Sequence, residues 1–376
     1  MSPNSSKSES SSLGLAANDA SLSDLEAQAL RYLEAGVATG VFPGAVLIFG
    51  APSQGQFSQV FAGQRGLTRN QEPVTPDLVY DLASLTKVLA TTFLIAKFVD
   101  QGLVDLFTPI GDLGFPGTIG DLTLADLLAH RSGLPAWRPY YLLSPDPDLA
   151  TSYRLALSQE PLVAKIGERT IYSDLNFLIL GFLAQDIGLG PLDEVFAKTV
   201  ADPNGLKTLG FRPQWGPLAP TEDGPRVGGP LTYPGLPTLG SVPLGRVHDD
   251  NALALGGVAG QAGLFGDAGS VFALIAHLAG VFAGRPGLIS KKTLALFLEP
   301  QPVAQGPPTR ALGFALGEGP LTGYYGHYGY TGCDFWWHPQ KDWAFALLTN
   351  RVQPTATNQK IASFRRALAA LLTENA

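Results

Sequence analysis

The sequence is poor in cysteine and in charged residues. It contains one cysteine, Cys333, so no disulfide can form within the chain, which fits a reducing compartment. Charged residues make up 15% of the chain, the formal net charge is −7, and the lysines and arginines form no cluster. We therefore expect no nucleic-acid partner, because phosphate binding requires a basic surface.

Long apolar runs are also missing. None reaches the roughly 18 residues of a membrane span, and the best candidate is interrupted by Lys97 and Asp100. Residues 1–20 are rich in serine and lack the apolar core of about seven residues that a secretory signal needs. We expect residues 1–20 to form a disordered tail, with no membrane span and a cytoplasmic location for the protein.

The remaining composition describes a large globular protein. The chain has 376 residues, of which 45% are hydrophobic, and is expected to form a single domain over residues 21–376. Apolar periodicity and turn residues predict strands and helices. The expected strands are 44–50, 57–62, 311–316, 332–338 and 343–349, and the expected helices are 21–35, 84–101, 122–130, 148–157, 174–187, 268–283 and 356–373. This order predicts an α/β (α+β) protein whose sheet combines both chain ends, with a mainly helical insert at roughly 81–255.

Two stretches rich in glycine stand out between these elements. Residues 204–250 show no sustained period and are expected to be a long connection covering part of the molecule. Residues 256–265 contain four glycines, but no Lys-Ser/Thr pair follows them, so they do not form a phosphate-binding loop. Close packing of backbone against backbone is the expected reason for these glycines.

The segment Ser84-Leu85-Thr86-Lys87 carries the strongest chemical signal. Residues three apart share one face of a helix, so Ser84 and Lys87 are expected side by side at a helix N-terminus. A serine hydroxyl becomes a nucleophile when a neighbouring base takes its proton, and a partly desolvated lysine can be that base. An ordinary helix start with a serine cap and a solvated lysine has the same pattern.

Two further segments suit the same chemistry. Tyr172-Ser173-Asp174 lies between helices, and a tyrosine near a lysine can act as a general base or acid. Residues 325–332 alternate glycine with aromatic residues and His327. Glycines there let a substrate approach the backbone closely, and an N–H on the edge of a strand can serve as an oxyanion donor. Taken alone, the first segment also fits a packing tyrosine and the second a tight turn.

Together these segments resemble the serine β-lactamase and penicillin-binding protein superfamily, in its class C-like and esterase-like branch. Its S-x-x-K motif matches Ser84 to Lys87, its Y-x-N motif matches Tyr172-Ser173-Asp174 with an aspartate for the asparagine, and its H-x-G motif matches His327-Tyr328-Gly329. Residues 125–135 and 256–265 also look like segments of this family. The resemblance covers roughly residues 21–372 and implies the β-lactamase/transpeptidase-like fold.

The resemblance also implies a role for each matched residue. Ser84 would form an acyl-enzyme, and Lys87 and Tyr172 would share its proton, with either of them as the base. The main-chain N–H groups of Ser84 and Tyr330 would form the oxyanion hole. His327, followed by Gly329, would stand where β-lactamases place a lysine that binds the substrate carboxylate.

Two of these positions bear on the substrate. Histidine at 327 replaces a permanent cation with a group that titrates near neutrality. An ionised Asp174 accepts hydrogen bonds but cannot donate one to a substrate amide; it could hold Lys87 protonated or bind a substrate amine. We therefore expect hydrolysis of an ester or of a D-amino-acid-type amide in a small molecule or short peptide, with weak or no β-lactamase activity. The alternative is a catalytically silent relative that binds a cell-wall peptide or similar ligand.

The other candidate residues point to no additional chemistry. An α/β-hydrolase is disfavoured because no G-x-S-x-G segment surrounds a serine. His248 and Asp249 are expected to line the site, but no third ligand is spaced to bind a metal with them, so neither a metal nor a cofactor is expected. His130 and His277 are interpreted as structural, and His338 and Cys333 have no clear role.

Overall fold

A six-stranded antiparallel sheet joins the two ends of the chain. The structure is a computed structural model that describes residues 12–230, 233–374 and 376. The strand order is β2-β1-β11-β10-β9-β8, and β1 lies antiparallel to β11 with Ala45 opposite Thr349. The strands are β1 (Gly44–Ala51), β2 (Gln56–Gly63), β8 (Ala315–Leu316), β9 (Tyr325–Tyr328), β10 (Asp334–His338) and β11 (Trp343–Thr349). The predicted sheet built from both termini is confirmed.

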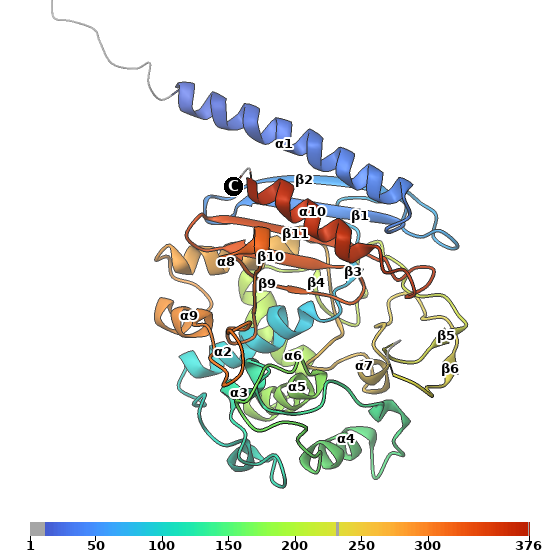
Figure 1. The fold of residues 1–376 in the computed structure, drawn as a ribbon, viewed down its shortest axis with the longest axis vertical. Helices are drawn as coiled ribbons and strands as arrows, with labels where there is room; N and C mark the ends of the chain where they lie inside the picture. Colours follow the sequence, from blue (N-terminus) through green and yellow to red (C-terminus); the bar gives the residue numbers. More distant parts are fainter. Residues whose placement is uncertain (1–11, 231–232, 375) are drawn as a thin grey trace, which may run out of the picture.

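Helices cover both faces of this sheet (Figure 1). The outer face carries α1 (Ser12–Ala38) and α10 (Ile361–Glu374), and the inner face packs against α8 (Ala268–Phe282). Side chains alternate between the faces: Leu47 and Phe49 of β1 belong to the outer core, whereas Val46 and Ile48 belong to the inner one. Because both faces are buried, β1 and β11 read as continuous apolar runs instead of alternating ones.

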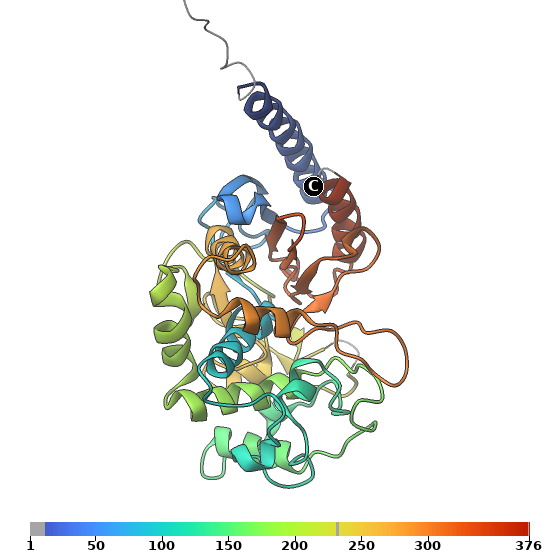
Figure 2. The same ribbon diagram turned by 90° about the vertical axis from the view of Figure 1, so that its left-hand side faces the viewer.

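The rest of the chain forms a mainly helical body against the inner side of the sheet (Figures 1 and 2). Its central helix α5 (Asp174–Gly188) is buried from Leu175 to Ala184. The other helices are α2 (Phe93–Asp100), α3 (Leu124–Leu128), α4 (Leu149–Ser158), α6 (Leu192–Phe196), α7 (Asp250–Ala254) and α9 (Lys291–Leu298). A small sheet has the order β3 (Tyr80–Asp81), β7 (Leu264–Gly266) and β4 (Leu209–Phe211), and β5 (Arg226–Val227) pairs with β6 (Thr238–Leu239).

The glycine-rich segment 256–265 packs backbone against backbone, as predicted. A Cβ atom on Gly260 would lie 2.0 Å from the carbonyl oxygen of Phe177 and 2.7 Å from Cα of Gly181, both in α5. No larger residue fits such a contact. This approach of the segment to α5 also brings the next residue, Gln261, beneath Lys87.

Several predicted boundaries were wrong. Helix α1 begins at Ser12 and not at 21, since leucine and alanine, good helix formers, recur in residues 13–17; residues 1–11 of the expected tail lie outside the described residues. Of the predicted strand 311–316, only Ala315–Leu316 is extended, because a turn closed by the bond from the Ala311 N–H to the Phe314 carbonyl occupies the rest.

Helix α10 begins at Ile361 and not at 356, because carbonyl oxygens before it are bound by a side chain. The guanidinium of Arg351 takes the carbonyl oxygens of Ala356 and Asn358, which are therefore unavailable to a helical turn. Strand β9 and the short helices α6 and α9 were not predicted at all.

Among the described residues, no single helix is both long and apolar enough to cross a membrane. Only α5 taken together with the segment Leu192–Asn204, at a bend of 70°, meets those criteria.

Candidate active site

Ser84 lies on a tightly held turn that follows β3. The preceding residue, Ala83, has a φ of 47°, which is left-handed and costs about 1 kcal/mol or more for a residue with a side chain. Asp81 stabilises this turn: its Oδ1 accepts the Ala83 N–H at 2.9 Å, and its Oδ2 accepts the His248 N–H at 2.7 Å. One buried carboxylate thus joins the Ser84 turn to the segment around His248.

Lys87 is fully buried, and its ammonium group lies among Ser84, Gln261 and Asp174. Its Nζ lies 3.0 Å from Ser84 Oγ, 2.9 Å from the Gln261 carbonyl oxygen and 2.8 Å from Asp174 Oδ1. Burial alone would lower the pKa of Lys87, but Asp174 and Tyr172 outweigh it and raise that pKa above the ordinary value. Lys87 is therefore held as a cation.

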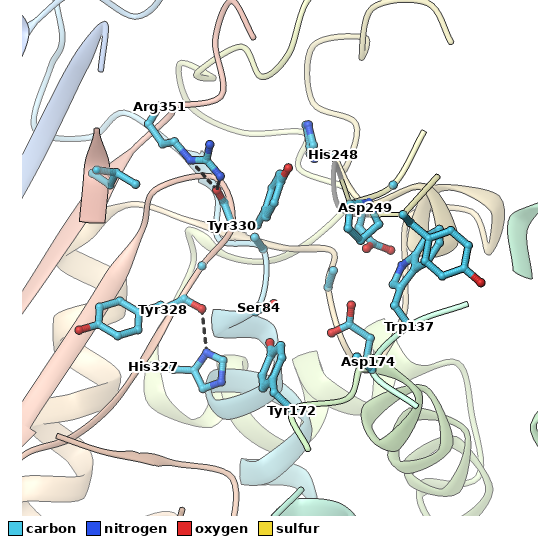
Figure 3. A pocket seen from close by; sticks show the side chains of 18 of the residues that line it. Ser84, Trp137, Tyr172, Asp174, His248, Asp249, His327, Tyr328, Tyr330 and Arg351 are labelled. Atoms are coloured by element: carbon cyan, nitrogen blue, oxygen red, sulfur yellow. Dashed lines mark hydrogen bonds between the residues drawn. The ribbon is translucent and has the colours of Figure 1, made fainter. Parts of the chain in front are cut away.

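The ring of Tyr172 stands between His327 and Asp174, with its hydroxyl directed toward Ser84 (Figure 3). Its centre lies 5.3 Å from Lys87 Nζ, 5.7 Å from the His327 ring and 4.7 Å from the His130 ring. His130 also accepts the N–H of Ser173 at its Nδ1, at 3.1 Å. The histidine that we interpreted as structural therefore fixes the segment carrying Tyr172.

Two main-chain N–H groups point to an oxyanion site. Among the described residues, neither the N–H of Ser84 nor that of Tyr330 has a hydrogen-bond acceptor. The carbonyl oxygens on either side of the Tyr330 N–H are held by arginines. That of Gly329, in the same peptide group, accepts Arg365 Nη2 at 3.1 Å, and that of Tyr330 accepts Nε and Nη2 of Arg351 at 2.9 and 2.7 Å (Figure 3). At Gly329, a Cβ would lie 2.8 Å from the Leu82 carbonyl oxygen, so glycine permits this strand end to approach the Ser84 turn.

His327 does not act as the titrating cation that we expected. Its side chain is buried, and Nδ1 lies 2.8 Å from the Tyr328 carbonyl oxygen, so Nδ1 carries the proton. Burial, followed by the nearby Arg310 and Lys87, lowers the pKa of His327 well below its ordinary value. His327 is therefore neutral at neutral pH, with an unpaired acceptor at Nε2.

Asp174 and Asp249 line the cavity on the side opposite His327 (Figure 3). Asp249 caps α7 by accepting the Ala252 N–H at 2.7 Å, and it accepts Gln261 Nε2 at 3.1 Å. Burial and the charge of Asp174 raise the pKa of Asp249 to about 6. His248 points away to Glu222, with 2.9 Å between Nε2 and Oε2.

Arg310 is the residue that the sequence analysis missed. It lies in the loop before β8 and lines the cavity, with its guanidinium carbon 5.3 Å from the centre of the Tyr172 ring. Its surroundings in the sequence are prolines and an isolated threonine with no periodicity, so no local pattern could have placed it in the site.

These residues share one cavity of about 750 Å³. Of the seven site residues chosen from the sequence, six line it, and Lys87 reaches Ser84 from below. The six are Ser84, Tyr172, Asp174, His327, Gly329 and Tyr330. Aromatic side chains, Trp137 and Tyr233, extend the wall beyond Asp249. The arrangement provides a nucleophile, proton-transfer groups and two free N–H donors, as acyl transfer requires.

Comparisons with known proteins identify the family of this chain. The model of the family named Beta-lactamase matches residues 30–370. A putative D-alanyl-D-alanine carboxypeptidase from Salmonella schwarzengrund (strain CVM19633) is 31% identical over 322 residues, which are 76% of this chain and 72% of that protein.

Solved structures share the fold at lower identity. EstCE1, a hydrolase with promiscuous acyltransferase activity, superposes with a TM-score of 0.70 at 20% identity, covering 94% of this chain and 99% of its own. The D-amino acid amidase from Ochrobactrum anthropi SV3, complexed with L-phenylalanine amide, has a TM-score of 0.66 at 19% identity and covers 93% and 97%. Both likenesses concern the β-lactamase/transpeptidase-like fold, which confirms the predicted fold class.

Proposed function

Because the chain belongs to the Beta-lactamase family of hydrolases, we propose that it is a serine hydrolase that forms an acyl-enzyme on Ser84. The observation that carries the proposal is the contact of Ser84 Oγ with Lys87, beside Tyr172 and two N–H groups without acceptors. In the proposal these groups supply what acyl transfer needs: a nucleophile, a proton carrier and oxyanion donors.

In this proposal Tyr172 is the general base and Lys87 a permanent cation. Asp174 raises the pKa of Lys87 and so keeps its amine protonated, and a protonated amine cannot accept the proton of Ser84. The cations Lys87 and Arg310 lie on the ring of Tyr172 and would stabilise the phenolate that a tyrosine base requires. Asp174, which stands where the family has asparagine, thus decides between the two bases.

The steps follow from these roles. Ser84 Oγ attacks the substrate carbonyl while its proton moves to the phenolate oxygen of Tyr172, and the N–H groups of Ser84 and Tyr330 bind the oxyanion. When the carbonyl re-forms, the bond to the leaving group breaks and Tyr172 protonates the leaving atom. Tyr172 then takes a proton from water, which attacks the acyl-enzyme, and the acid product leaves as Ser84 regains its proton.

The substrate proposed is an ester or a D-amino-acid-type amide or peptide, with little β-lactamase activity. Names of relatives support this class, since they include a putative D-alanyl-D-alanine carboxypeptidase and a D-amino acid amidase. At Asp174, a carboxylate cannot donate the hydrogen bond that asparagine gives to a substrate amide, so amide recognition differs from that of β-lactamases.

Intact-mass spectrometry after reaction with a fluorophosphonate tests the proposal, together with turnover of short-chain p-nitrophenyl esters. We expect one adduct per chain, located on Ser84, and measurable ester hydrolysis. Ser84→Ala should lose both while keeping the wild-type unfolding transition. A penicillin, tested separately, should acylate slowly or not at all. Folded protein with neither adduct nor turnover would contradict the proposal and favour a silent ligand-binding relative.

A further inference from the structure

Arg365 is hydrogen-bonded to the peptide group that carries one of the proposed oxyanion donors. The carbonyl oxygen of Gly329 accepts Nη2 of Arg365 at 3.1 Å. In a planar trans peptide the C=O and N–H groups point in opposite directions. A side chain that holds the Gly329 carbonyl therefore also aims the Tyr330 N–H, which has no acceptor among the residues that the structure describes.

Three further contacts hold this guanidinium in place. Its Nη2 also donates to the Cys333 carbonyl at 2.6 Å, its Nε lies 3.0 Å from Asp334 Oδ1, and its carbon is 4.9 Å from the centre of the Tyr328 ring. The ion pair is largely buried, with 11% of the Arg365 side chain and 3% of the Asp334 side chain exposed. The Gly329 N–H donates to the same Cys333 carbonyl at 2.6 Å. The guanidinium thus joins α10 to both ends of the turn between β9 and β10.

This contact changes the peptide group as a donor. Asp334 takes Nε and leaves Nη2 to the two carbonyl oxygens. A cation bonded to a carbonyl oxygen forms a charge-assisted hydrogen bond. Hydrogen bonds linked through one group polarise each other, so the N–H at the other end of the peptide becomes a stronger donor. The gain is largest when the acceptor becomes charged, as the substrate oxygen does in the transition state of acyl transfer.

The peptide group that carries the Ser84 N–H has a similar arrangement. Its carbonyl oxygen belongs to Ala83 and accepts the Thr86 N–H at 3.0 Å and Thr86 Oγ1 at 2.6 Å. Both proposed oxyanion donors therefore belong to peptide groups whose carbonyl oxygens are hydrogen-bonded. A neutral hydroxyl group serves at one of them and a cation at the other.

We propose that Arg365 is a positioning residue for acyl transfer, which aims the Tyr330 N–H at the substrate oxygen and strengthens it as a donor. This inference rests on the proposed function. It assigns part of the stabilisation of the transition state to α10, a helix that none of the three motifs includes. The kinetic signature of such a role is a loss in kcat with KM nearly unchanged.

Hydrolysis of p-nitrophenyl esters tests this role. Arg365→Met should lower kcat about tenfold and change KM by less than about twofold, a smaller loss than removal of a whole oxyanion donor causes. Arg365→Lys keeps a cation beside Asp334 with fewer donors and should give an intermediate kcat. The matched control is Arg366→Met, which removes the same charge from an exposed neighbouring position on α10. Its kcat should stay within about twofold of the wild-type value.

A second variant covers the case in which Arg365→Met does not fold. That variant leaves Asp334 as a buried carboxylate without its partner. The double variant Arg365→Met/Asp334→Asn removes this charge as well and should show the same loss in kcat. Urea unfolding of each variant identifies the samples that are folded under the assay conditions.

Phosphorus NMR of the fluorophosphonate adduct on Ser84 gives a readout that a loss of stability alone does not change. The phosphonyl oxygen of this adduct would occupy the oxyanion site, so the phosphorus chemical shift reports the donors there. In Arg365→Met the resonance should move toward that of the unfolded adduct. In Arg366→Met it should coincide with the wild-type resonance.

Three results would overturn the inference. The first is a folded Arg365→Met or double variant with wild-type kcat. The second is a rise in KM alone, as expected of a side chain that contacts the substrate directly. The third is a lower kcat with an unchanged phosphorus resonance, because the oxyanion donor would then be undisturbed. Failure of the proposed function is distinguishable from all three, since the wild type would then form no adduct and hydrolyse no ester.

Discussion

The ion pair between Lys87 and Asp174 leads to a quantitative prediction. Lys87 is completely buried, Asp174 is 19% exposed, and the charged atoms are 2.8 Å apart. We expect Asp174→Asn to destabilise the protein, because it leaves a buried ammonium without its counter-charge. The same change should make Lys87 easier to deprotonate, since burial lowers its pKa and Asp174 opposes that effect.

Two limits set the expected coupling free energy between Lys87 and Asp174. Removing one partner of a buried pair costs about 3–5 kcal/mol. Lys87 could instead become neutral in the variant. Deprotonating it at pH 7 from the ordinary pKa of 10.5 costs about 5 kcal/mol, so the variant cannot lose more folding free energy than this. Asp174 is partly exposed, and Ser84 and Gln261 still accept from Nζ. We therefore expect a coupling free energy of about 2–4 kcal/mol.

A double-mutant cycle measures this coupling. Free energies of unfolding in urea are compared for the wild type, Asp174→Asn, Lys87→Met and the double variant at pH 7. The matched control is a cycle on Arg154 and Asp186, which lie at the same 2.8 Å but with 32% and 45% exposed side chains. That pair should give about 0–1 kcal/mol.

The pH dependence provides a second check on the wild type. Because the folded-state pKa of Lys87 is raised, the stability that its charge contributes is fully present below the ordinary value of 10.5 and is lost as the pH rises through the folded value. A coupling no larger than that of the surface control would refute the reasoning. Lys87 would then be effectively solvated, and the argument for Tyr172 as the base would fail.

Three further changes test other parts of the structure. Gly260→Ala should lower the free energy of unfolding by about 1–3 kcal/mol, because its Cβ would lie 2.0 Å from the Phe177 carbonyl oxygen; an unchanged urea midpoint would show that this contact relaxes. Asp249→Asn should stabilise the protein above pH 6 by at most about 3 kcal/mol. Burial raises the folded-state pKa of Asp249 to about 6, so the wild type loses stability as this carboxyl group ionises between about pH 4 and pH 6. The variant should lose that dependence, and a wild-type pH profile would contradict the assignment. Arg351→Met should lower kcat about tenfold with little change in KM, because two of its N–H groups fix the Tyr330 carbonyl, in the peptide group next to the one that carries the Tyr330 N–H. A rise in KM alone would argue against a role in positioning the proposed oxyanion donor.

The parts of the molecule that could be predicted from the sequence are those set by local patterns. The strands of residues 44–50 and 343–349 and the helix at 174–187 follow from apolar runs and capping residues, and the structure has them within one or two residues. The short motifs also predicted that Ser84, Tyr172 and His327 belong to one site, and all three line one cavity. Motifs carry this information because each one fixes a turn whose chemistry depends on adjacent residues.

The charge state of the site could not be predicted in the same way. From the sequence, His327 was expected to titrate near neutrality. In the structure its burial and two cations from distant segments, Arg310 and Lys87, lower its pKa and keep it neutral. Arg310 reached the cavity through a loop with no periodicity. Electrostatics depends on which side chains meet after folding, and a single sequence does not contain those distances.

The pairing of β1 with β11 has a consequence for biosynthesis. Val46 and its partner Leu348 lie 302 positions apart in the sequence (348 − 46). While the chain emerges from the ribosome, the β1–β2 hairpin has no neighbour on its inner edge, and that edge stays open to other chains until β11 is made. Ser84 and Lys87 emerge early, whereas Tyr330 follows them by more than two hundred residues. The cavity is thus completed only by the last strands, so a chain truncated before β9 would carry Ser84 and Lys87 without Tyr330.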